Sequence, residues 1–568
     1  MEYKNFNAVS AAKSEIEATV AKAIATATLA GTLPQGECAP YVVETPADPA
    51  NGDFSVNAAL VNARVFRLAP PQIAAAIVAN IELANTSFEK LEVAGPGFIN
   101  FYLKHSYYEN VLRAVHALGE NYGRTNFGAG ERVNVEFVSA NPTGPMHLGN
   151  ARGGALGDGI AAVLSWAGYD VSREFLINDA GNQIARLGHS LSVRYLQHFN
   201  GEASVEFPED GYHSQDIIEH AKAYIAQHGD SLLNESEEVR AQTLAAFVLP
   251  KNIAAMKAAL EKYNIQYDTW FSEQSLHDSG AVMQAVQLLT QRGYTYVKDG
   301  ATWYKATQFG SEKDEVLLRA NGVPTYFAAD IAYHYNKFAT RGFARAIDIW
   351  GADHHGHVAR MKGAMDAIGL AGDKLDIILM QLVRLVRAGE PVRMSKRAGN
   401  AITLNDLLDE IPIDAARFMF NMREPSSQMD LDLDIAVAQS SENPVYYVQY
   451  AHARICSLLK TLQGEGITFA GAENAELTLL THPTEIELIR HISYLPGEIQ
   501  NAARTYDPAR ITRYVIDLAT LYHKMYTACR VKGEAPALVQ ARLALTIAAR
   551  TALANCLGLL KVSIPEQM

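Results

Sequence analysis

Residues 132–177 restrict the possible folds more than any other part of the chain. The run ERVNVEFVS alternates charged or polar residues with apolar ones, which predicts a half-buried strand. The segment NPTGP that follows excludes both helix and sheet, and apolar residues at helical spacing then continue as far as Gly168. DVSREFLI returns as a second strand. Strand, tight turn, helix and strand predict half of a doubly wound parallel sheet, whose ligand lies beyond the carboxyl ends of its strands.

The same order of elements recurs in residues 345–369. Ile347–Trp350 is predicted to be a buried strand, Gly351 its turn, and the residues up to Gly369 a helix. A polar, helix-rich stretch at about 190–285 separates this half from the first. We therefore expect one Rossmann-type α/β domain over residues 116–425, split by a helical insertion.

The two ends of the chain predict separate domains. Residues 1–115 combine helical periodicity at 11–29 and 71–83 with two short strands around the Gly-Pro-Gly break in LEVAGPGFINFYL, which indicates a small α/β domain. Residues 440–568 consist almost entirely of amphipathic helical patterns, which predict an all-α bundle.

Composition excludes several classes of protein. The four cysteines lie far apart without a CxxC pair, which argues against cysteine-held zinc and favours a reducing compartment. No signal peptide or membrane span is apparent, so we expect a cytoplasmic protein without a membrane partner. The net charge of −13 argues against a protein coated in nucleic acid, and we expect no DNA partner. It leaves room for a local basic face.

The tetrapeptide HLGN stands at the start of the first predicted helix. His147 would lie where free backbone N–H groups and the helix dipole favour phosphate, Asn150 would add a donor, and Gly149 would leave the backbone open to a base. An ordinary helix start with a surface histidine is the alternative interpretation.

Two further segments invite chemical interpretations. Asp353, His354, His355 and His357 follow the second predicted strand. They suit a polar ligand pocket, and zinc is the alternative although no third ligand is evident elsewhere. Further on, RMSKR places three cations between glycine-containing turns, which suits a mobile clamp on a polyphosphate; a solvated basic turn is the alternative.

Together, HLGN and RMSKR resemble the HIGH and KMSKS signatures of class I aminoacyl-tRNA synthetases. The segments SANPTGPMHLGN, REFLINDAGNQI, VPTYFAADIAYH, GADHHGHVARMKGAM and NPVYYVQYAHARI narrow the resemblance to the bacterial arginyl-tRNA synthetases. The resemblance implies a Rossmann-type catalytic domain between a tRNA-contacting N-terminal domain and a helical anticodon-binding domain. It also implies formation of arginyl-adenylate from L-arginine and ATP with Mg²⁺, transfer of arginine to its tRNA, no tightly bound protein-ligated metal, and a monomer.

The resemblance assigns the ATP-binding residues individually. The HIGH region comprises Ala140, Asn141, Pro142, Thr143, Gly144, Pro145, Met146, His147, Leu148, Gly149 and Asn150. The residues implied to act on ATP are His147, Gly149, Asn150, Arg393, Ser395 and Lys396. Asn150 replaces the second histidine of HIGH, and it can donate a hydrogen bond but cannot become cationic.

The resemblance also assigns residues to the amino acid. Glu136, Ser139 and Asn141 match contacts to the α-amino group. Tyr326 and Asp330 match the pair that recognises the guanidinium, and their i, i+4 spacing places them on one face of a predicted helix. Taken without the resemblance, the preferred interpretation of Asp330 is an acid in the first turn that complements the dipole of its helix.

Residues for tRNA are predicted in both terminal domains. Phe98 and Asn100 match positions that contact the outer corner of the tRNA. Between residues 504 and 532, cations are interleaved with Tyr506, Tyr514, Tyr522 and Tyr526, which suits single-stranded RNA. A helical bundle with core tyrosines and solvated cations is the alternative. For the whole chain, three other functions compete with this one: a different class I synthetase, a nucleotidylyltransferase that makes a small adenylylated metabolite, and an RNA-binding paralogue with impaired catalysis.

Overall fold

The computed structural model describes residue 3 and residues 5–392 and 402–568. At its centre lies a five-stranded parallel sheet with the strand order β12-β11-β5-β6-β7. Its strands are β5 (Arg132–Glu136), β6 (Asp170–Ile177), β7 (Thr269–Ser272), β11 (Arg345–Gly351) and β12 (Leu375–Met380). The chain proceeds outward from β5 to β7 and then returns to the other side of β5, so the order reverses between β5 and β11. This reversal confirms the predicted doubly wound sheet.

The two predicted strand–turn–helix units are both present. Helix α6 (Leu148–Trp166) connects β5 to β6, and α13 (His355–Ile368) connects β11 to β12. The glycine-rich face of α6 lies directly on the sheet, because a Cβ at Gly157 would be 2.1 Å from Cγ of Phe137. Any larger residue there would force the helix away from the strand that it follows.

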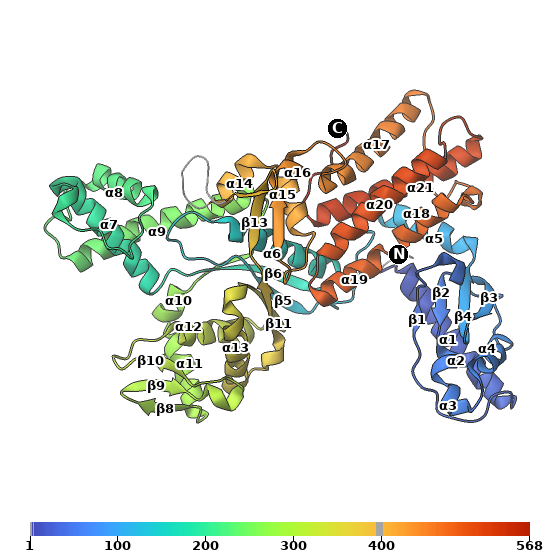
Figure 1. The fold of residues 1–568 in the computed structure, drawn as a ribbon, viewed down its shortest axis with the longest axis horizontal. Coiled ribbons are helices and arrows are strands. Elements are labelled where there is room, and N and C mark those ends of the chain that lie inside the picture. Colours follow the sequence, from blue (N-terminus) through green and yellow to red (C-terminus); the bar gives the residue numbers. More distant parts are fainter. Residues whose placement is uncertain (1–2, 4, 393–401) are drawn as a thin grey trace.

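Two additions interrupt the sheet (Figure 1). Helices α7 (Asn182–Asn200), α8 (Gln215–His228) and α9 (Glu237–Lys262) share a small apolar core of their own. Strand β7 lies inside the interval of about 190–285 predicted as insertion, but it belongs to the main sheet. A second addition follows with α10 (Gln274–Asp278), α11 (Ala281–Gln291), β8 (Thr295–Lys298), β9 (Ala301–Tyr304) and β10 (Glu315–Leu318), and α12 (Tyr326–Tyr335) leads back to the sheet.

The N-terminal part is an antiparallel sheet with the order β1-β2-β4-β3 and helices against it. The predicted strands around Gly-Pro-Gly are β3 (Phe88–Ala94) and β4 (Phe98–Leu103). The remaining elements are α1 (Ala8–Leu29), β1 (Val43–Glu44), β2 (Phe54–Val56), α2 (Ala58–Val61), α3 (Ala63–Phe66) and α4 (Pro70–Val78). Helix α5 (His105–Leu118) leaves this sheet and packs on the C-terminal helices.

After β12 the chain forms a small mixed sheet and then helices. The small sheet contains β13 (Val383–Arg387), β14 (Glu390–Val392) and β15 (Met429–Asp432). Helices α14 (Leu404–Glu410), α15 (Ile413–Phe420) and α16 (Leu433–Val437) lie beside it. The C-terminal bundle consists of α17 (Pro444–Gly464), α18 (Pro483–Ser493), α19 (Leu495–Thr505), α20 (Ala509–Ala528) and α21 (Pro536–Leu559), which confirms the predicted all-α domain.

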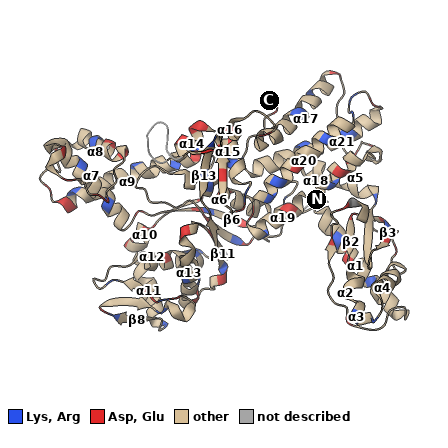
Figure 2. Cartoon of the chain, viewed as in Figure 1, with Lys and Arg blue, Asp and Glu red and all other residues tan. Residues whose placement is uncertain are grey.

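A buried ionic hub fastens this bundle to the central sheet. Asp158 of α6 accepts hydrogen bonds from Arg173 of β6 at 3.0 Å, from Arg417 of α15 at 2.5 Å, and from Lys561 after α21 at 3.1 Å. Burial opposes ionisation of Asp158, but these three cations outweigh it and lower the pKa of its carboxyl group. In Figure 2, basic and acidic residues are interspersed over every lobe of the molecule.

Two described helices, α9 and α21, are long and apolar enough to cross a membrane by length and composition, although no such stretch was expected from the sequence. This is weak evidence, because core helices of globular proteins pass the same test. Helix α21 is such a core helix, because 61% of its most apolar 18-residue stretch is buried inside the molecule.

Candidate active site

Two cavities open at the carboxyl ends of β5 and β11, where the strand order reverses. The wide cavity, of about 940 Å³, extends toward the start of α6, and the narrow cavity, of about 540 Å³, extends toward α12. Six residues line both cavities: Val138, Ser139, Ile349, Gly351, Asp353 and His354. The two cavities therefore form one continuous site at the position where doubly wound sheets bind their ligands.

The wide cavity contains most of the predicted HIGH region. Residues 140–150 line it except for Pro142 and Leu148. His147 is the N-cap of α6, and its Nδ1 accepts a hydrogen bond from the Gly149 N–H at 3.1 Å. Partial burial of the ring lowers the pKa of His147, which favours the neutral form. Because Nδ1 is the acceptor, the neutral ring carries its proton on Nε2 and can donate it to a ligand.

Asn150 completes this helix start. Its Oδ1 accepts a hydrogen bond from the His147 backbone N–H at 2.9 Å, which leaves the side-chain amide as a donor. The segment after the predicted RMSKR motif runs beside this turn, because Leu404 N–H donates to Met146 O at 2.8 Å and Leu148 N–H donates to Ile402 O at 3.2 Å. The predicted ATP-binding residues Arg393, Ser395 and Lys396 lie outside the described residues.

The helical insertion also contributes to the wide cavity, which the sequence did not indicate. Tyr212 and Ser214, from the loop before α8, line this cavity. The loop is held in place because the Tyr212 backbone N–H donates to Oγ of the buried Ser190 at 2.9 Å. In addition, Asn252 of α9 donates to the carbonyl oxygen of Pro142 at 2.9 Å. The insertion thus contacts the HIGH turn through α9 and forms part of the wall of the wide cavity.

Backbone strain occurs where the two cavities meet. Val138 has φ of +73° and Ser139 has φ of +26°, values that side chains with a Cβ rarely adopt. Ser139 Oγ donates to Oε1 of Glu136 at 2.7 Å and accepts from the Leu176 N–H at 3.1 Å. These two bonds connect β5 to β6 and hold the strained turn beneath the site.

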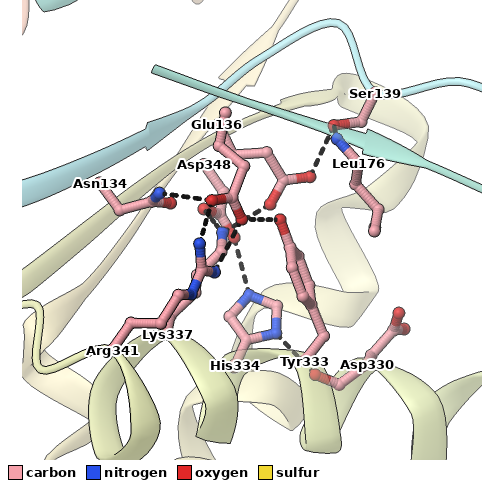
Figure 3. Close-up of polar contacts among 11 residues, drawn as sticks. Asn134, Glu136, Ser139, Leu176, Asp330, Tyr333, His334, Lys337, Arg341 and Asp348 are labelled. Carbon is pink, nitrogen blue, oxygen red and sulfur yellow. Dashed lines mark hydrogen bonds and ion pairs between the residues drawn. The ribbon is translucent and has the colours of Figure 1, made fainter. Parts of the chain in front are cut away.

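Below the narrow cavity lies a buried cluster of charged groups (Figure 3). Three adjacent strands each contribute one buried carboxylate, namely Glu136, Glu174 and Asp348. Three cationic residues pair with these carboxylates. His334 belongs to α12, Lys337 to the π-helical turn Asn336–Thr340 that follows it, and Arg341 is the next residue after that turn.

The contacts in this cluster are short and directional. Lys337 Nζ donates to Glu136 Oε2 at 2.5 Å and to Asp348 Oδ1 at 2.7 Å. His334 Nε2 is 2.7 Å from Asp348 Oδ2, and its Nδ1 is 2.7 Å from the backbone oxygen of Asp330. Since both partners of His334 are acceptors, both ring nitrogens carry protons and the ring is cationic. Arg341 pairs with Glu174, so three cations balance three carboxylates.

The pKa shifts agree with this balance. Burial disfavours the charged form of Asp348, but the charges of Lys337 and His334 outweigh it and lower its pKa to about 2. Burial likewise opposes protonation of His334, and its hydrogen bond to Asp348 overcomes this and raises its pKa. Burial raises the pKa of the Glu136 carboxyl group, although Lys337 opposes this shift.

At the far end of the narrow cavity, the carboxylate of Asp330 points away from this cluster (Figure 3). Its Oδ2 is 3.1 Å from His357 Nε2, and the His357 ring rests against Trp350 with 5.4 Å between ring centroids. Tyr326 lies one turn earlier on α12 and is half exposed, and its hydroxyl accepts from the Asn182 N–H at 3.2 Å. The predicted guanidinium pair therefore shares one helix face and one cavity.

A further carboxylate, which sequence interpretation missed, lies beyond Tyr326. Glu273 follows β7, is buried, and lines a small adjoining cavity that Tyr326 also borders. Burial and the nearby charges of Asp330 and Asp179 raise the pKa of Glu273 to about 7. Among the described residues, no Lys or Arg lies within ion-pair distance of any of these three acids. This end of the site is therefore acidic. The basic side chains that line it are His357, against Asp330, Arg360, which pairs with Glu315, and Arg319, on the wall of the small cavity.

The structure brings four of the five predicted arginine-binding residues into the narrow cavity: Glu136, Ser139, Tyr326 and Asp330. Asn141 lines the wide cavity instead. Glu136 lies almost entirely beneath the surface, with its two oxygens engaged by Ser139 and Lys337. The buried cluster had a sequence signal, because Tyr326, Asp330, His334, Lys337 and Arg341 recur every three or four residues.

The residues predicted for tRNA differ in accessibility. Phe98 on β4 is half-buried, whereas Asn100 is buried and its Oδ1 accepts from Ser55 Oγ at 2.8 Å. In the C-terminal bundle, Tyr514 and Tyr522 are core residues, so the alternative interpretation holds for them. Four of the interleaved cations pair with acids, in the pairs Arg510–Glu498, Arg513–Asp507, Lys524–Glu487 and Lys532–Glu465.

A different face of the bundle offers partly exposed aromatic rings. A cavity of about 430 Å³ between α17 and α20 is lined by Ser441, Tyr446, Tyr447, Tyr450, Arg454 and His523. The rings of Tyr446 and Tyr450 are nearly parallel, and the guanidinium of Arg454 lies 5.2 Å from the centre of the Tyr450 ring. Flat rings beside a cation suit an unstacked base.

Among the described residues, no three His, Cys, Asp or Glu side chains converge as a metal site would require. The histidines after β11 have separate partners: His354 lies 3.7 Å from Asp353, and His357 lies 3.1 Å from Asp330.

Comparison with known proteins places every part of the chain. Three family models match: "Arginyl tRNA synthetase N terminal domain" at residues 14–103, "tRNA synthetases class I (R), catalytic domain" at 114–456, and "DALR anticodon binding domain" at 448–568. The arginine–tRNA ligase of Acetivibrio thermocellus is 52% identical over 562 residues, covering 99% of this chain and 100% of that protein. The arginine–tRNA ligase of Caldanaerobacter subterraneus is 53% identical with the same coverage.

Comparison with solved structures gives the same result. A putative arginyl-tRNA synthetase from Campylobacter jejuni has a TM-score of 0.75 and 32% identity, and the match covers 82% of this chain and 100% of that one. Thermus thermophilus arginyl-tRNA synthetase has a TM-score of 0.72 and covers 96% of this chain and 99% of that one; at 23% identity it supports the fold alone.

Proposed function

The chain belongs to the arginyl-tRNA synthetase family and joins L-arginine to tRNA with ATP, as an arginine–tRNA ligase, and from this premise we propose that its two cavities divide the reaction. The wide cavity takes ATP and the narrow cavity takes arginine. The observation that carries this assignment is the acidic far end of the narrow cavity together with the small cavity beside it, where Asp330 and Glu273 have no Lys or Arg ion-pair partner among the described residues. A guanidinium supplies the missing cation.

Arginine then lies along the narrow cavity in one direction. Its guanidinium is held by Asp330 and Glu273 beside Tyr326, and its α-amino group faces Glu136 and Ser139 near β5. This orientation brings the carboxylate to the residues that line both cavities. The carboxylate can therefore attack the α-phosphate of ATP in the wide cavity without either substrate moving.

The start of α6 supports the ATP assignment. His147 offers its Nε2–H, Asn150 offers its side-chain amide, and the helix dipole favours the phosphates. Because these donors are fixed by the cap of α6, they need no rearrangement as charge moves onto the leaving pyrophosphate. We propose that Arg393, Ser395 and Lys396 add contacts to the phosphates, as the motif predicts, and that Mg²⁺ enters with ATP as part of the substrate.

For tRNA, we propose the aromatic cavity between α17 and α20 as the place where an anticodon base stacks. Its rings and Arg454 support this assignment. The assignment of Phe98 and Asn100 to tRNA stays a prediction, as do the monomeric state, the cytoplasmic location and the domain limits 1–115, 116–425 and 440–568.

Substitution of Asp330 tests the arginine assignment. Asp330→Asn keeps the shape but removes the charge that faces the guanidinium, so kcat/KM for arginine should fall on the order of a hundredfold, as for a truncated buried charge pair. Arginine-dependent exchange of pyrophosphate into ATP, with tRNA present, measures this, and the KM for ATP should stay within about twofold. Glu312→Gln, an exposed acid outside both cavities, is the matched control. Near-normal exchange by Asp330→Asn would refute the assignment.

A further inference from the structure

The two groups of residues that would hold the ends of arginine belong to different elements. Glu136 ends β5 and Ser139 follows three residues later, whereas Tyr326 and Asp330 begin α12, almost two hundred residues further along the chain. Their separation is therefore determined by how α12 sits against the sheet. Apolar burial alone is non-directional, so it specifies this separation less sharply than directional polar contacts do.

A chain of four polar contacts fixes this separation. It runs from Glu136 to Lys337 at 2.5 Å, from Lys337 to Asp348 at 2.7 Å, from Asp348 to His334 at 2.7 Å, and from His334 to the backbone oxygen of Asp330 at 2.7 Å. Figure 3 shows these contacts, which begin at Glu136 and finish at Asp330, two residues that line the narrow cavity. The chain of contacts passes through Asp348 of β11, the strand next to β5.

We propose that this chain of contacts is a spacer that sets the length of amino acid the site accepts. The inference rests on the proposed assignment of the narrow cavity to arginine. Lys337 and His334 are positioning residues in it: Lys337 lines neither cavity, and His334 borders the narrow cavity but has both ring nitrogens engaged by Asp348 and the Asp330 backbone. Both act by holding the two binding groups apart. The expected consequence is discrimination against guanidino acids that are one methylene longer or shorter than arginine.

Two properties make this chain stiffer than ordinary packing. Its charged side chains are almost completely buried, with exposed fractions of 0% for Lys337, 0% for Asp348, 3% for His334 and 4% for Glu136. A shift of α12 along the sheet would separate charges in a medium of low dielectric and leave them unpaired, which is strongly unfavourable. In addition, His334 lies one turn after Asp330 on the same helix, so its bond to Asp348 holds the register of α12 directly.

The test uses the full-length enzyme with tRNA and measures relative specificity. Arginine competes with homoarginine, one methylene longer, or with 2-amino-4-guanidinobutanoate, one methylene shorter, and the ratio of kcat/KM values is determined. This ratio does not depend on how much of the enzyme is active, so a partly unfolded variant still gives a valid result. A site that measures one methylene is expected to prefer arginine by roughly 10- to 200-fold.

The informative variants either remove or preserve the polar contacts of the spacer. Lys337→Met and His334→Leu should reduce the preference for arginine at least about fivefold toward one or both analogues, with the KM for ATP little changed. Lys337→Arg keeps the charge and should recover most of the preference. Arg542→Met is the matched control, because it breaks a buried ion pair with Glu485 at 2.7 Å in the helical bundle, away from both cavities.

The outcomes separate this inference from the assignment on which it rests. If Lys337→Met and His334→Leu lower kcat/KM for arginine and both analogues by the same factor, the spacer is refuted, even when Asp330→Asn abolishes arginine-dependent exchange. An equal loss of preference in Arg542→Met would also refute it. If Asp330→Asn itself leaves arginine-dependent exchange normal, the assignment of the cavity fails first.

Discussion

The two ends of the narrow cavity hold similar groups in opposite electrostatic states. At the β5 end, Glu136, Glu174 and Asp348 are matched by three cations from and just after α12. Asp330 lies at the far end, Glu273 lines the small cavity beside it, and Asp179 is close to Glu273; no Lys or Arg among the described residues pairs with these three acids. The same helix thus borders one neutralised cluster and one acidic cluster.

The difference shows how one helix, α12, can be held in position by one cluster and contribute to a ligand-binding site through the other. Neutralised charges add structural definition, because they are satisfied before substrate arrives and lose pairing if α12 moves. Carboxylates without a cationic partner have the opposite effect. They raise the free energy of the empty site, and a bound guanidinium relieves that cost, which contributes to affinity and selectivity.

The largest expected effect comes from breaking the neutralised cluster. Asp348→Asn would leave Lys337 and His334 buried beside a neutral amide, so the free energy of unfolding should fall by about 3–5 kcal/mol. The low pKa of Asp348 gives the same sign, because its contribution is present above its unfolded pKa of about 3.9 and is lost as the pH falls toward 2.

Thermal or urea unfolding of the arginine-free protein at pH 7.5 measures this loss. Asp430→Asn is the control, because it breaks an exposed ion pair with Arg384 at 2.6 Å and should lower stability by less than about 1 kcal/mol. Equal losses in the two variants would remove the distinction between a neutralised, buried cluster and an ordinary surface pair.

A smaller effect of opposite sign is expected at the acidic end. Glu273→Gln removes a buried charge that has no cation, so the arginine-free protein should become more stable by ~1–3 kcal/mol at pH 8. The same change removes a contact to the guanidinium, and the KM for arginine should rise on the order of 10- to 100-fold with the KM for ATP unchanged. Calorimetry and pyrophosphate exchange measure the two quantities. A variant that loses both stability and affinity would show that Glu273 has a structural role.

The sequence predicted those parts of this site that depend on local patterns. The turns after β5 and β11 follow from short-range periodicity, and so does the shared helix face of Tyr326 and Asp330. His147 was placed at the start of α6 for the same reason. These features need no knowledge of which strands are neighbours.

The remaining features depend on tertiary contacts. Glu136, Glu174 and Asp348 meet because β5 lies between β6 and β11, and nothing local to Asp348 shows that Lys337 will pair with it. Glu273 was missed because β7, the strand before it, was predicted to belong to the insertion. Two interleaved tyrosines of α20 were ambiguous for a related reason, since helical spacing does not tell a core face from an RNA-binding face.

The smallest predicted effect is a pH dependence that belongs to the acidic end alone. Burial and the charges of Asp330 and Asp179 raise the pKa of Glu273 to about 7. Below that pH the carboxyl group is protonated and attracts the guanidinium less, so the KM for arginine should fall about five- to tenfold between pH 6 and pH 8. The stability of the arginine-free protein should move the other way. The folded protein holds this proton more tightly than the unfolded chain does, so the contribution of Glu273 to stability is lost as the pH rises through 7.

Both profiles should flatten in Glu273→Gln, and neither should flatten in Glu312→Gln. Exchange assays at saturating ATP give the KM for arginine at each pH, and the KM for ATP in the same buffers separates this titration from that of His147 in the wide cavity. An identical arginine profile in the wild type and Glu273→Gln would mean that Glu273 does not face the guanidinium. The acidic end would then consist, for the substrate, of Asp330 alone, and the contrast between the two ends of the cavity would reduce to a single carboxylate.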